Sequence, residues 1–328
     1  MRFAFVFGAG ASAAEGAPTI ANFLSESYRL YGNNAEFTLI WNFIKESFSK
    51  PITGYQDMQD NFPSIDEIFS LIDYCLISNT SLTRQHSIDS IHKIKRQLIS
   101  LMTRTLREMA KSYDTHLVFL ERHLNAFKGC DIISLNYDTL LDKALTSIVK
   151  DKVNYGFSSE NSFAQVKGKY RLYKLHGSLN WGNCTFCKNI TIFDRDVAHE
   201  LGSNYPCKEC SHHNLEPVII TPTLLKDYNY AKLQNVWDSA FKVISKCDVL
   251  VFIGYSLNFA DVSIIHLIKR AISAGGNKLK KIVVIDKDTS DNPCPPTLSR
   301  YIKIFNKEIK YIRDGFQKDL DLMKIIEQ

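Results

Sequence analysis

Four cysteines are arranged in two pairs with the spacing of a metal site. Cys184 and Cys187 form one Cys-x-x-Cys pair and Cys207 and Cys210 form the other, separated by residues 188–206. This spacing is typical of a zinc ribbon, in which each pair forms a knuckle and four thiolates surround one Zn²⁺. The alternative, two redox pairs, requires a coincidence of both spacings. Because all four ligands are protein thiolates, no coordination position is open, and we expect the zinc to be structural.

A glycine turn follows the first predicted strand. Phe3–Phe7 is an apolar run typical of a buried strand. Gly8, Gly10 and Ala13 then match G-x-G-x-x-G/A, in which a glycine turn and a helix N-terminus bind phosphate groups. A tight turn without a ligand is the alternative. A dehydrogenase would carry an acidic strand end about 20 residues further on, but residues 21–30 favour a helix, so a different type of nucleotide loop is expected.

Polar residues follow several later strands. Residues 130–135 favour a strand that ends in Asn136-Tyr137-Asp138, and a second short strand ends at His176. Such side chains, at the carboxyl ends of parallel strands, face the ligand crevice of an α/β sheet. His176 is either a catalytic group or a structurally satisfied histidine. Asp286 follows a third strand, 281–285, and either holds a ribose diol or caps a helix.

The intervening segments favour helices and further strands. Residues 20–128 are predicted to be mostly helical, with a loop at 49–63 and a capping box, Ser64 with Glu67, that starts the next helix. Further strands are expected at 218–221, 249–253 and around 301–305. We therefore predict an α/β fold with a Rossmann-like parallel sheet flanked by helices. The domain covers residues 1–328, with a helical insertion at 20–128 and a zinc-ribbon lobe at 182–214.

Bulk composition is that of a soluble globular protein. The 328 residues are 45% hydrophobic and 23% charged, and the formal net charge of +5 is spread along the chain. Direct nucleic-acid binding is therefore not expected. No apolar run approaches the ~18 residues of a membrane span, and the apolar run before Gly8 is shorter than a secretory signal core. We expect a cytoplasmic protein, whose eight cysteines serve as metal ligands or buried thiols.

Taken in order, the motifs resemble the sirtuin (Sir2) superfamily. The resemblance spans nearly the whole chain and is carried by Gly8-Ala-Gly-Ala-Ser12, Gly16-Ala-Pro-Thr19, Asn136-Tyr-Asp138, His176-Gly-Ser178, the four cysteines, Gly254-Tyr-Ser-Leu257, Ile285-Asp286 and Asp314-Gly-Phe316. It implies that NAD is bound and consumed. The implied NAD-binding residues are Gly8, Ala9, Gly10, Ser12, Thr19, Asp138, Gly254, Ser256, Asp286 and Phe316.

The same resemblance implies the catalytic roles. Asn136 positions the reacting nucleotide or the attacking water, Asp138 holds the nicotinamide amide, and His176 is the general base. Protein-deacylating sirtuins follow the glycine loop with Gly-Ile-Pro-Asp-Phe-Arg, whereas this chain has Gly16-Ala-Pro-Thr-Ile-Ala-Asn-Phe23. This departure and the long helical insertion resemble a divergent bacterial Sir2-like branch that destroys NAD in anti-phage defence. The intact zinc ribbon points the other way, because many members of that branch lack one.

The first functional hypothesis is therefore an NAD glycohydrolase (NADase), which releases nicotinamide and ADP-ribose. An NAD-dependent protein lysine deacylase and a non-catalytic nucleotide-sensing module are the alternatives. Because unrestrained NAD destruction is toxic to its host, we expect activity to be gated by homo-oligomer assembly or by a regulatory partner protein. The helices of residues 64–127 are the expected contact surface, and no membrane partner is expected.

Overall fold

The computed structural model describes residues 1–48, 63–124, 131–149, 153–157, 170–202, 205–211, 214–226, 228 and 230–327. The chain forms two compact units, which are described separately. The first comprises Met1–Ala17, Ala110–Ser178 and Tyr230–Gln328, and the second Pro18–Met109 and Leu179–Asn229. The loop predicted at 49–63 falls, except for its last residue, outside the described residues. Along the described chain, no helix is both long and apolar enough to cross a membrane.

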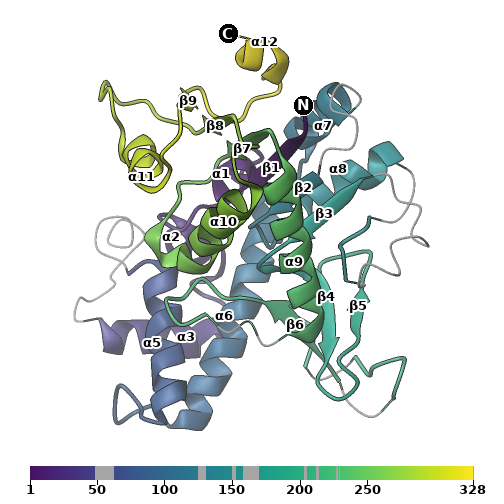
Figure 1. The fold of residues 1–328 in the computed structure, drawn as a ribbon. Coiled ribbons are helices and arrows are strands. Elements are labelled where there is room, and N and C mark those ends of the chain that lie inside the picture. Colours follow the sequence, from purple (N-terminus) through teal and green to yellow (C-terminus); the bar gives the residue numbers. More distant parts are fainter. Residues whose placement is uncertain are drawn as a thin grey trace. The chain divides into compact units, whose positions relative to one another are not determined.

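A six-stranded parallel sheet forms the centre of the first unit (Figure 1). Its strands are β1 (Phe3–Phe7), β2 (Asp131–Ser134), β3 (Arg171–Lys174), β7 (Val249–Ile253), β8 (Lys281–Ile285) and β9 (Ile309–Ile312). Their order is β3-β2-β1-β7-β8-β9, and every neighbouring pair is parallel. With the strands counted along the chain, this is the 3-2-1-4-5-6 order of the Rossmann fold. The predicted fold class is confirmed.

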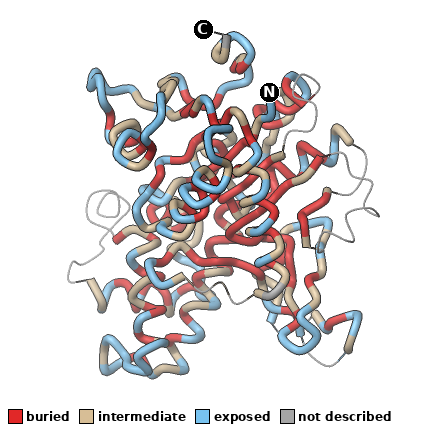
Figure 2. The backbone as a smooth tube through the Cα atoms, viewed as in Figure 1, coloured by how far each residue is buried: buried red, intermediate tan, exposed pale blue. Residues whose placement is uncertain are grey.

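Helices pack on both faces of this sheet. They are α1 (Ala9–Ala13), α7 (Asp114–Leu124), α8 (Leu140–Val149), α9 (Ala231–Lys246), α10 (Val262–Gly275), α11 (Pro296–Ile304) and α12 (Leu322–Glu327). Val6 pairs with Phe252 in register, so these two side chains share one face, and Phe7 points to the other. Phe7 meets Phe119 of α7, with ring centroids 5.8 Å apart, while Phe252 meets Tyr301 of α11 at 5.0 Å. Figure 2 shows the resulting core as buried strands.

The second unit contains helices and a small sheet. Its helices are α2 (Phe23–Tyr31), α3 (Thr38–Ser47), α5 (Ile65–Ser78), α6 (Ile88–Met109) and the 3-10 helix η1 (Ala35–Phe37). The amphipathic α6 contacts α2, α3 and α5. The small sheet has the order β5-β4-β6, with β4 (Gly177–Cys184), β5 (Ile190–Ile192) and β6 (Leu215–Ile219). The first two residues of β4 belong to the first unit.

Local sequence signals are visible in the helical part of the second unit. The predicted capping box is present: the Ser64 N–H donates to Glu67 Oε2 at 2.7 Å. Glu67 therefore provides a hydrogen-bond acceptor for the backbone N–H of Ser64, the residue before α5. Farther along, the Ser27 and Thr105 hydroxyls form a buried hydrogen bond of 3.0 Å between α2 and α6. Such pairing removes the cost of burying two hydroxyl groups inside a helical core.

One predicted strand lies in a different sheet, and another is wrong. Residues 218–221 do not join the parallel sheet, because residues up to Ile219 belong to β6 of the small sheet. Residues 301–305 lie at the end of α11, and the strand comes later, as β9. Tyr301 and Phe305, four residues apart, are buried while Ile302 is exposed, which is the spacing of a helix face. Pro296 begins this helix at a position that favours proline.

The loops after β1 and β7 meet backbone to backbone. The Gly8 N–H donates to the Ile253 carbonyl at 2.9 Å, and the Gly10 N–H donates to the Gly254 carbonyl at 2.8 Å. Gly254 has a φ of +62°, and a Cβ atom there would lie 2.1 Å from the Ala11 nitrogen. Glycine is therefore required by both conformation and space. Ala9, between the two glycines of the first loop, is exposed.

The contact predicts different costs for two glycine substitutions. Gly276→Ala meets a similar φ of +63° with no atom within 4 Å, so it reports backbone strain alone, about 1–3 kcal/mol. Gly254→Ala adds the clash with the first loop and should cost at least about 2 kcal/mol more. Unfolding in denaturant measures both values. Equal stability of the two variants would show that the contact with the first loop does not exclude a side chain at position 254.

Candidate functional site

Most predicted site residues follow the carboxyl ends of strands in the parallel sheet. Gly8 follows β1, Asn136 follows β2, His176 follows β3, Gly254 follows β7 and Asp286 follows β8. Parallel strands end at one edge of a sheet, so the topology gathers these residues along that edge. From β1 the chain order of the strands runs outward in both directions, through β2 and β3 on one side and through β7, β8 and β9 on the other. Ligands of open α/β sheets bind at the switch point between the two halves, here between β1 and β7.

Asn136 is held by the loop after β1. Its buried Nδ2 donates to the Gly8 carbonyl and to Ser12 Oγ, both at 2.8 Å. Ser12 Oγ donates in turn to Asp138 Oδ2 at 2.7 Å, and Asp138 Oδ1 accepts the Leu140 N–H at the start of α8. Since both amide hydrogens of Asn136 are used, its carbonyl oxygen is the end of the amide directed toward other groups. The chain of hydrogen bonds fixes that direction.

His176 is tied to the loop after β2, which carries Asn136. Its Nδ1 lies 3.1 Å from the Leu135 carbonyl oxygen, and its ring stacks near the Tyr137 ring, with centroids 6.1 Å apart. A carbonyl can only accept, so Nδ1 carries the hydrogen and Nε2 is the basic atom of the neutral ring. Leu135 immediately precedes Asn136. The two predicted catalytic residues are therefore linked through one stretch of backbone.

Sequence reasoning did not select Asp261 as a site residue. Its Oδ1 lies 4.0 Å from His176 Nε2, and its Oδ2 accepts the Tyr255 hydroxyl at 3.2 Å. Asp261 ends the 3-10 helix η3 (Phe259–Asp261) and precedes α10. An Asp in front of a helix is normally interpreted as an N-cap, so the pattern offered no reason to place it beside a histidine.

Lys174, on β3, is a second residue that sequence reasoning missed. It is fully buried, and its Nζ donates to Asp142 Oδ2 at 2.9 Å, Ser178 Oγ at 2.6 Å and the Asp138 carbonyl at 2.6 Å. The Tyr155 hydroxyl also donates to Asp142. This ammonium group joins the loop after β2 and helix α8 to the first residues of β4. A lysine inside an apolar strand was the available signal, because lysine is almost never fully buried without partners.

Two predicted nucleotide-binding residues lie near the ends of β7 and β8. Ser256 is exposed, and its carbonyl accepts Arg300 Nε at 2.6 Å. Asp286 Oδ2 accepts the Tyr311 hydroxyl at 3.4 Å. Burial and the carboxylates of Asp286 and Asp288 raise the pKa of Tyr311 to about 12, so the phenol stays protonated and donates. The carboxyl group of Asp286 is thus oriented from the neighbouring strand, β9.

The remaining two predicted binding residues, Phe316 and Thr19, do not directly follow a strand of the parallel sheet. Phe316 is buried against Phe7 and His116, with ring centroids 5.9 and 5.1 Å from its own. Thr19 belongs to the second unit, where its N–H and hydroxyl both donate to Asn22 Oδ1. A role for Phe316 and Thr19 in nucleotide binding stays a prediction.

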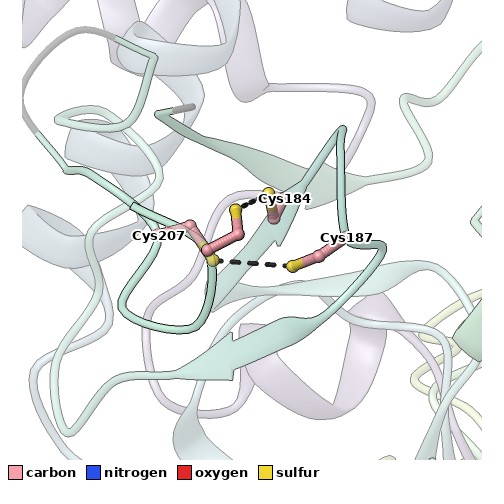
Figure 3. Close-up of side chains that lie close together, drawn as sticks. Cys184, Cys187 and Cys207 are labelled. Atoms are coloured by element: carbon pink, nitrogen blue, oxygen red, sulfur yellow. Dashed lines mark hydrogen bonds between the residues drawn. The ribbon is translucent and has the colours of Figure 1, made fainter. Parts of the chain in front are cut away.

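The four cysteines of the predicted ribbon gather in the second unit. Their sulfur atoms all lie within 4.8 Å of one another. The sulfurs of two pairs are each 3.6 Å apart, Cys184 with Cys210 and Cys187 with Cys207. Figure 3 labels Cys184, Cys187 and Cys207 of this cluster. Four sulfurs at about 2.3 Å from a tetrahedral metal ion are about 3.8 Å apart. The cluster therefore fits a metal of this kind, and the separations are too long for disulfide bonds.

Both cysteine pairs have the same backbone turn. The Lys188 N–H donates to the Cys184 carbonyl at 2.9 Å, and the Ser211 N–H donates to the Cys207 carbonyl at 2.8 Å. Lys188 and Ser211 each follow the second cysteine of a pair and have positive φ angles of 59° and 56°. The chain thus forms two matching knuckles that direct both thiols of each pair to one point.

The sheet order and the strand-end residues place the first unit in the Rossmann-like class of α/β proteins. A family model described as "SIR2-like domain" matches residues 131–304, more than half of the chain. The chain belongs to this family, and the predicted sirtuin superfamily membership is confirmed.

The chain was also compared with curated proteins and with solved structures. A search of curated proteins found no match. Among solved structures, "Structure of Sir2Tm bound to a propionylated peptide" is 14% identical, with 99% of this chain and 92% of that chain covered and a TM-score of 0.45. "Crystal structure of a Sir2 homolog–NAD complex" is 18% identical, with coverage of 99% and 88% and a TM-score of 0.47.

The Lys174–Asp142 ion pair predicts a non-additive pattern of stability. Lys174→Met leaves the Asp142 carboxylate buried beside no cation, which should cost about 3–5 kcal/mol. Adding Asp142→Asn removes that charge but keeps an acceptor for Tyr155. The double variant should therefore be more stable than Lys174→Met alone by at least about 1 kcal/mol. Denaturant unfolding of the two single variants and the double variant tests this, and strictly additive losses would contradict it.

Proposed function

We propose that this protein is an NAD glycohydrolase. In the proposed reaction, water attacks the ribose carbon that bears nicotinamide, and the carbon–nitrogen bond breaks. Nicotinamide leaves with the electron pair of that bond, and ADP-ribose and one proton are the other products. The transition state carries oxocarbenium-like charge, which fixed polar groups stabilise better than mobile solvent.

One observation carries the proposal: Asn136 and His176 are fixed to one stretch of backbone at the ligand-binding edge of the sheet. The Asn136 amide is oriented by Gly8 and Ser12, and His176 Nδ1 by Leu135. An oriented amide oxygen holds a water or a ribose hydroxyl. The basic Nε2 of His176 would accept the proton, since imidazole titrates near neutrality.

The NAD-binding residues are proposed from family membership together with their places in the fold. The loop of Gly8, Ala9, Gly10 and Ser12 would lie against the pyrophosphate, and Gly254 and Ser256 against the phosphate and ribose. Asp286 would hold the adenosine ribose, because its carboxyl group is at a strand end and is oriented by Tyr311. Asp138 would hold the nicotinamide amide. Thr19 and Phe316 complete the proposed set.

A protein lysine deacylase is the second candidate, and the four-cysteine cluster favours it. Such clusters are common among deacylating sirtuins and rarer in the NAD-destroying branch. The altered segment Gly16–Phe23 favours hydrolysis, because it lacks the Gly-Ile-Pro-Asp-Phe-Arg pattern of deacylases. We accordingly keep NAD hydrolysis, in anti-phage defence, as the proposed activity.

We also propose that the activity is gated by a homo-oligomer or a regulatory partner protein. The helices of residues 64–127 are the proposed contact surface. Support comes from α5, on which Tyr74 and Ile77 expose 62% and 70% of their surface. The part of α7 near Phe119 is occupied by the sheet, so α5 and α6 are the better candidates within that range.

The catalytic roles predict large losses of turnover without loss of fold. Asn136→Ala and His176→Ala should each lower NAD cleavage by about 100-fold or more. Nicotinamide and ADP-ribose are measured after incubation of pure protein with NAD, with and without an acylated peptide. Asn277→Ala and His266→Ala are matched controls, because both residues are exposed in the first unit and neither belongs to the proposed site. Near-normal cleavage by His176→Ala would contradict the mechanism, and cleavage only with the peptide would favour the deacylase.

Zinc binding by the cysteine cluster predicts a metal stoichiometry. We expect one Zn per folded chain, and Cys187→Ser should lose the metal and expose the lobe to protease, because binding is coupled to folding at such sites. Cys294→Ser is the control, since Cys294 is an exposed cysteine outside the cluster. Well under one Zn in the folded wild-type chain would refute a structural zinc site.

A further inference from the structure

Asp261 occupies a helix N-cap position but does not cap the helix. It immediately precedes α10, yet its side chain makes no capping hydrogen bond. An Asp at this position ordinarily accepts an N–H of its own helix, which stabilises the first turn. The Asp261 carboxylate instead binds the Tyr255 hydroxyl through Oδ2 and directs Oδ1 toward His176. Both of these neighbours of the carboxylate lie outside α10.

The carboxylate faces the atom of His176 that changes protonation. Nδ1 lies against the Leu135 carbonyl and keeps its hydrogen, so a second proton can enter only at Nε2. Asp261 Oδ1 lies 4.0 Å from that nitrogen. An opposite charge at this distance attracts the imidazolium form and not the neutral ring, and therefore favours the charged state.

Three other groups of this region, Tyr137, Lys174 and Asp138, have contacts of their own. The Tyr137 ring stacks on the imidazole and brings no charge. The Lys174 ammonium is bound to Asp142 and Ser178, and the Asp138 carboxylate accepts from Ser12 and the start of α8. Asp261 Oδ1 is directed at Nε2, and the Tyr255 hydroxyl binds the other oxygen of that carboxylate.

We propose that Asp261 is the positioning residue that stabilises the protonated form of His176 during NAD hydrolysis. The inference rests on the proposed function. As water bonds to the ribose carbon and nicotinamide departs, one water proton passes to His176 Nε2. The resulting imidazolium lies beside the Asp261 carboxylate, and the proton is released to solvent once ADP-ribose has formed.

Titration of His176 tests the pairing without any turnover. Asp261→Asn removes an attraction that exists only for the cation, so the pKa of His176, followed by NMR in the protein without NAD, should fall by about one unit. Asp261→Glu, which keeps the charge, should restore most of the difference. Asp248→Asn is the matched control: Asp248 precedes β7 at the opposite end of that strand and binds the Arg2 N–H. An unchanged His176 titration in Asp261→Asn would overturn the proposal.

Kinetics provide the second measurement. In Asp261→Asn the acid limb of the kcat profile should move to lower pH, because a weaker base loses its proton at lower pH, while kcat near neutrality falls about tenfold and KM changes little. A parallel loss at every pH, with an unshifted limb, would indicate a structural role and overturn the assignment. If the wild-type protein does not cleave NAD, the proposed function fails, whereas the NMR titration still decides whether Asp261 stabilises the His176 cation.

Discussion

The close approach of two backbones at the centre of the parallel sheet is the constraint on which the rest of the site depends. The loop after β1 donates its Gly8 and Gly10 N–H groups to the end of β7, and Gly254 leaves no room for a side chain. The two loops can share the switch point only because each has glycine at the point of contact, Gly8 and Gly10 on one side and Gly254 on the other. This contact sets the position of Ser12 in α1, and Ser12 in turn holds Asn136 and Asp138.

A second layer of interactions joins the loop after β2 and helix α8 to the first residues of β4. The buried Lys174 ammonium binds a carboxylate, a hydroxyl and a backbone carbonyl, so its charge is compensated in an apolar setting. A buried ion pair of this kind contributes little net stability but penalises any arrangement that separates its members. Its value here is geometric, because it fixes where the Asn136 and His176 loops lie relative to each other. An electrostatic role for Asp261 would use the same preorganised frame.

The cysteine cluster is positioned by local turns and not by a large core. Two short turns with left-handed residues, Lys188 and Ser211, direct two pairs of thiols to one point. The surrounding core is small: Leu215 is buried with Cys184 and Cys207, and a few partly buried side chains pack against them. Small cores of this size are usually stabilised by a metal or by disulfides. Folding of this lobe is therefore expected to depend on its metal ligands. The parallel sheet, in contrast, has an extensive core of its own.

The sequence alone determined what depends on neighbouring residues. The apolar runs of β1, β7 and β8, the capping box at Ser64 and the spacing of the four cysteines are local patterns, and each corresponds to the predicted element. The tertiary structure decided what depends on residues distant in the chain. Tyr301 and Phe305 form a helix face because Phe252 packs against them, Lys174 is tolerated inside a strand because Asp142 lies beside it, and Asp261 turns away from its own helix toward His176. Burial and charge pairing act through space, so spacing along the chain does not encode them.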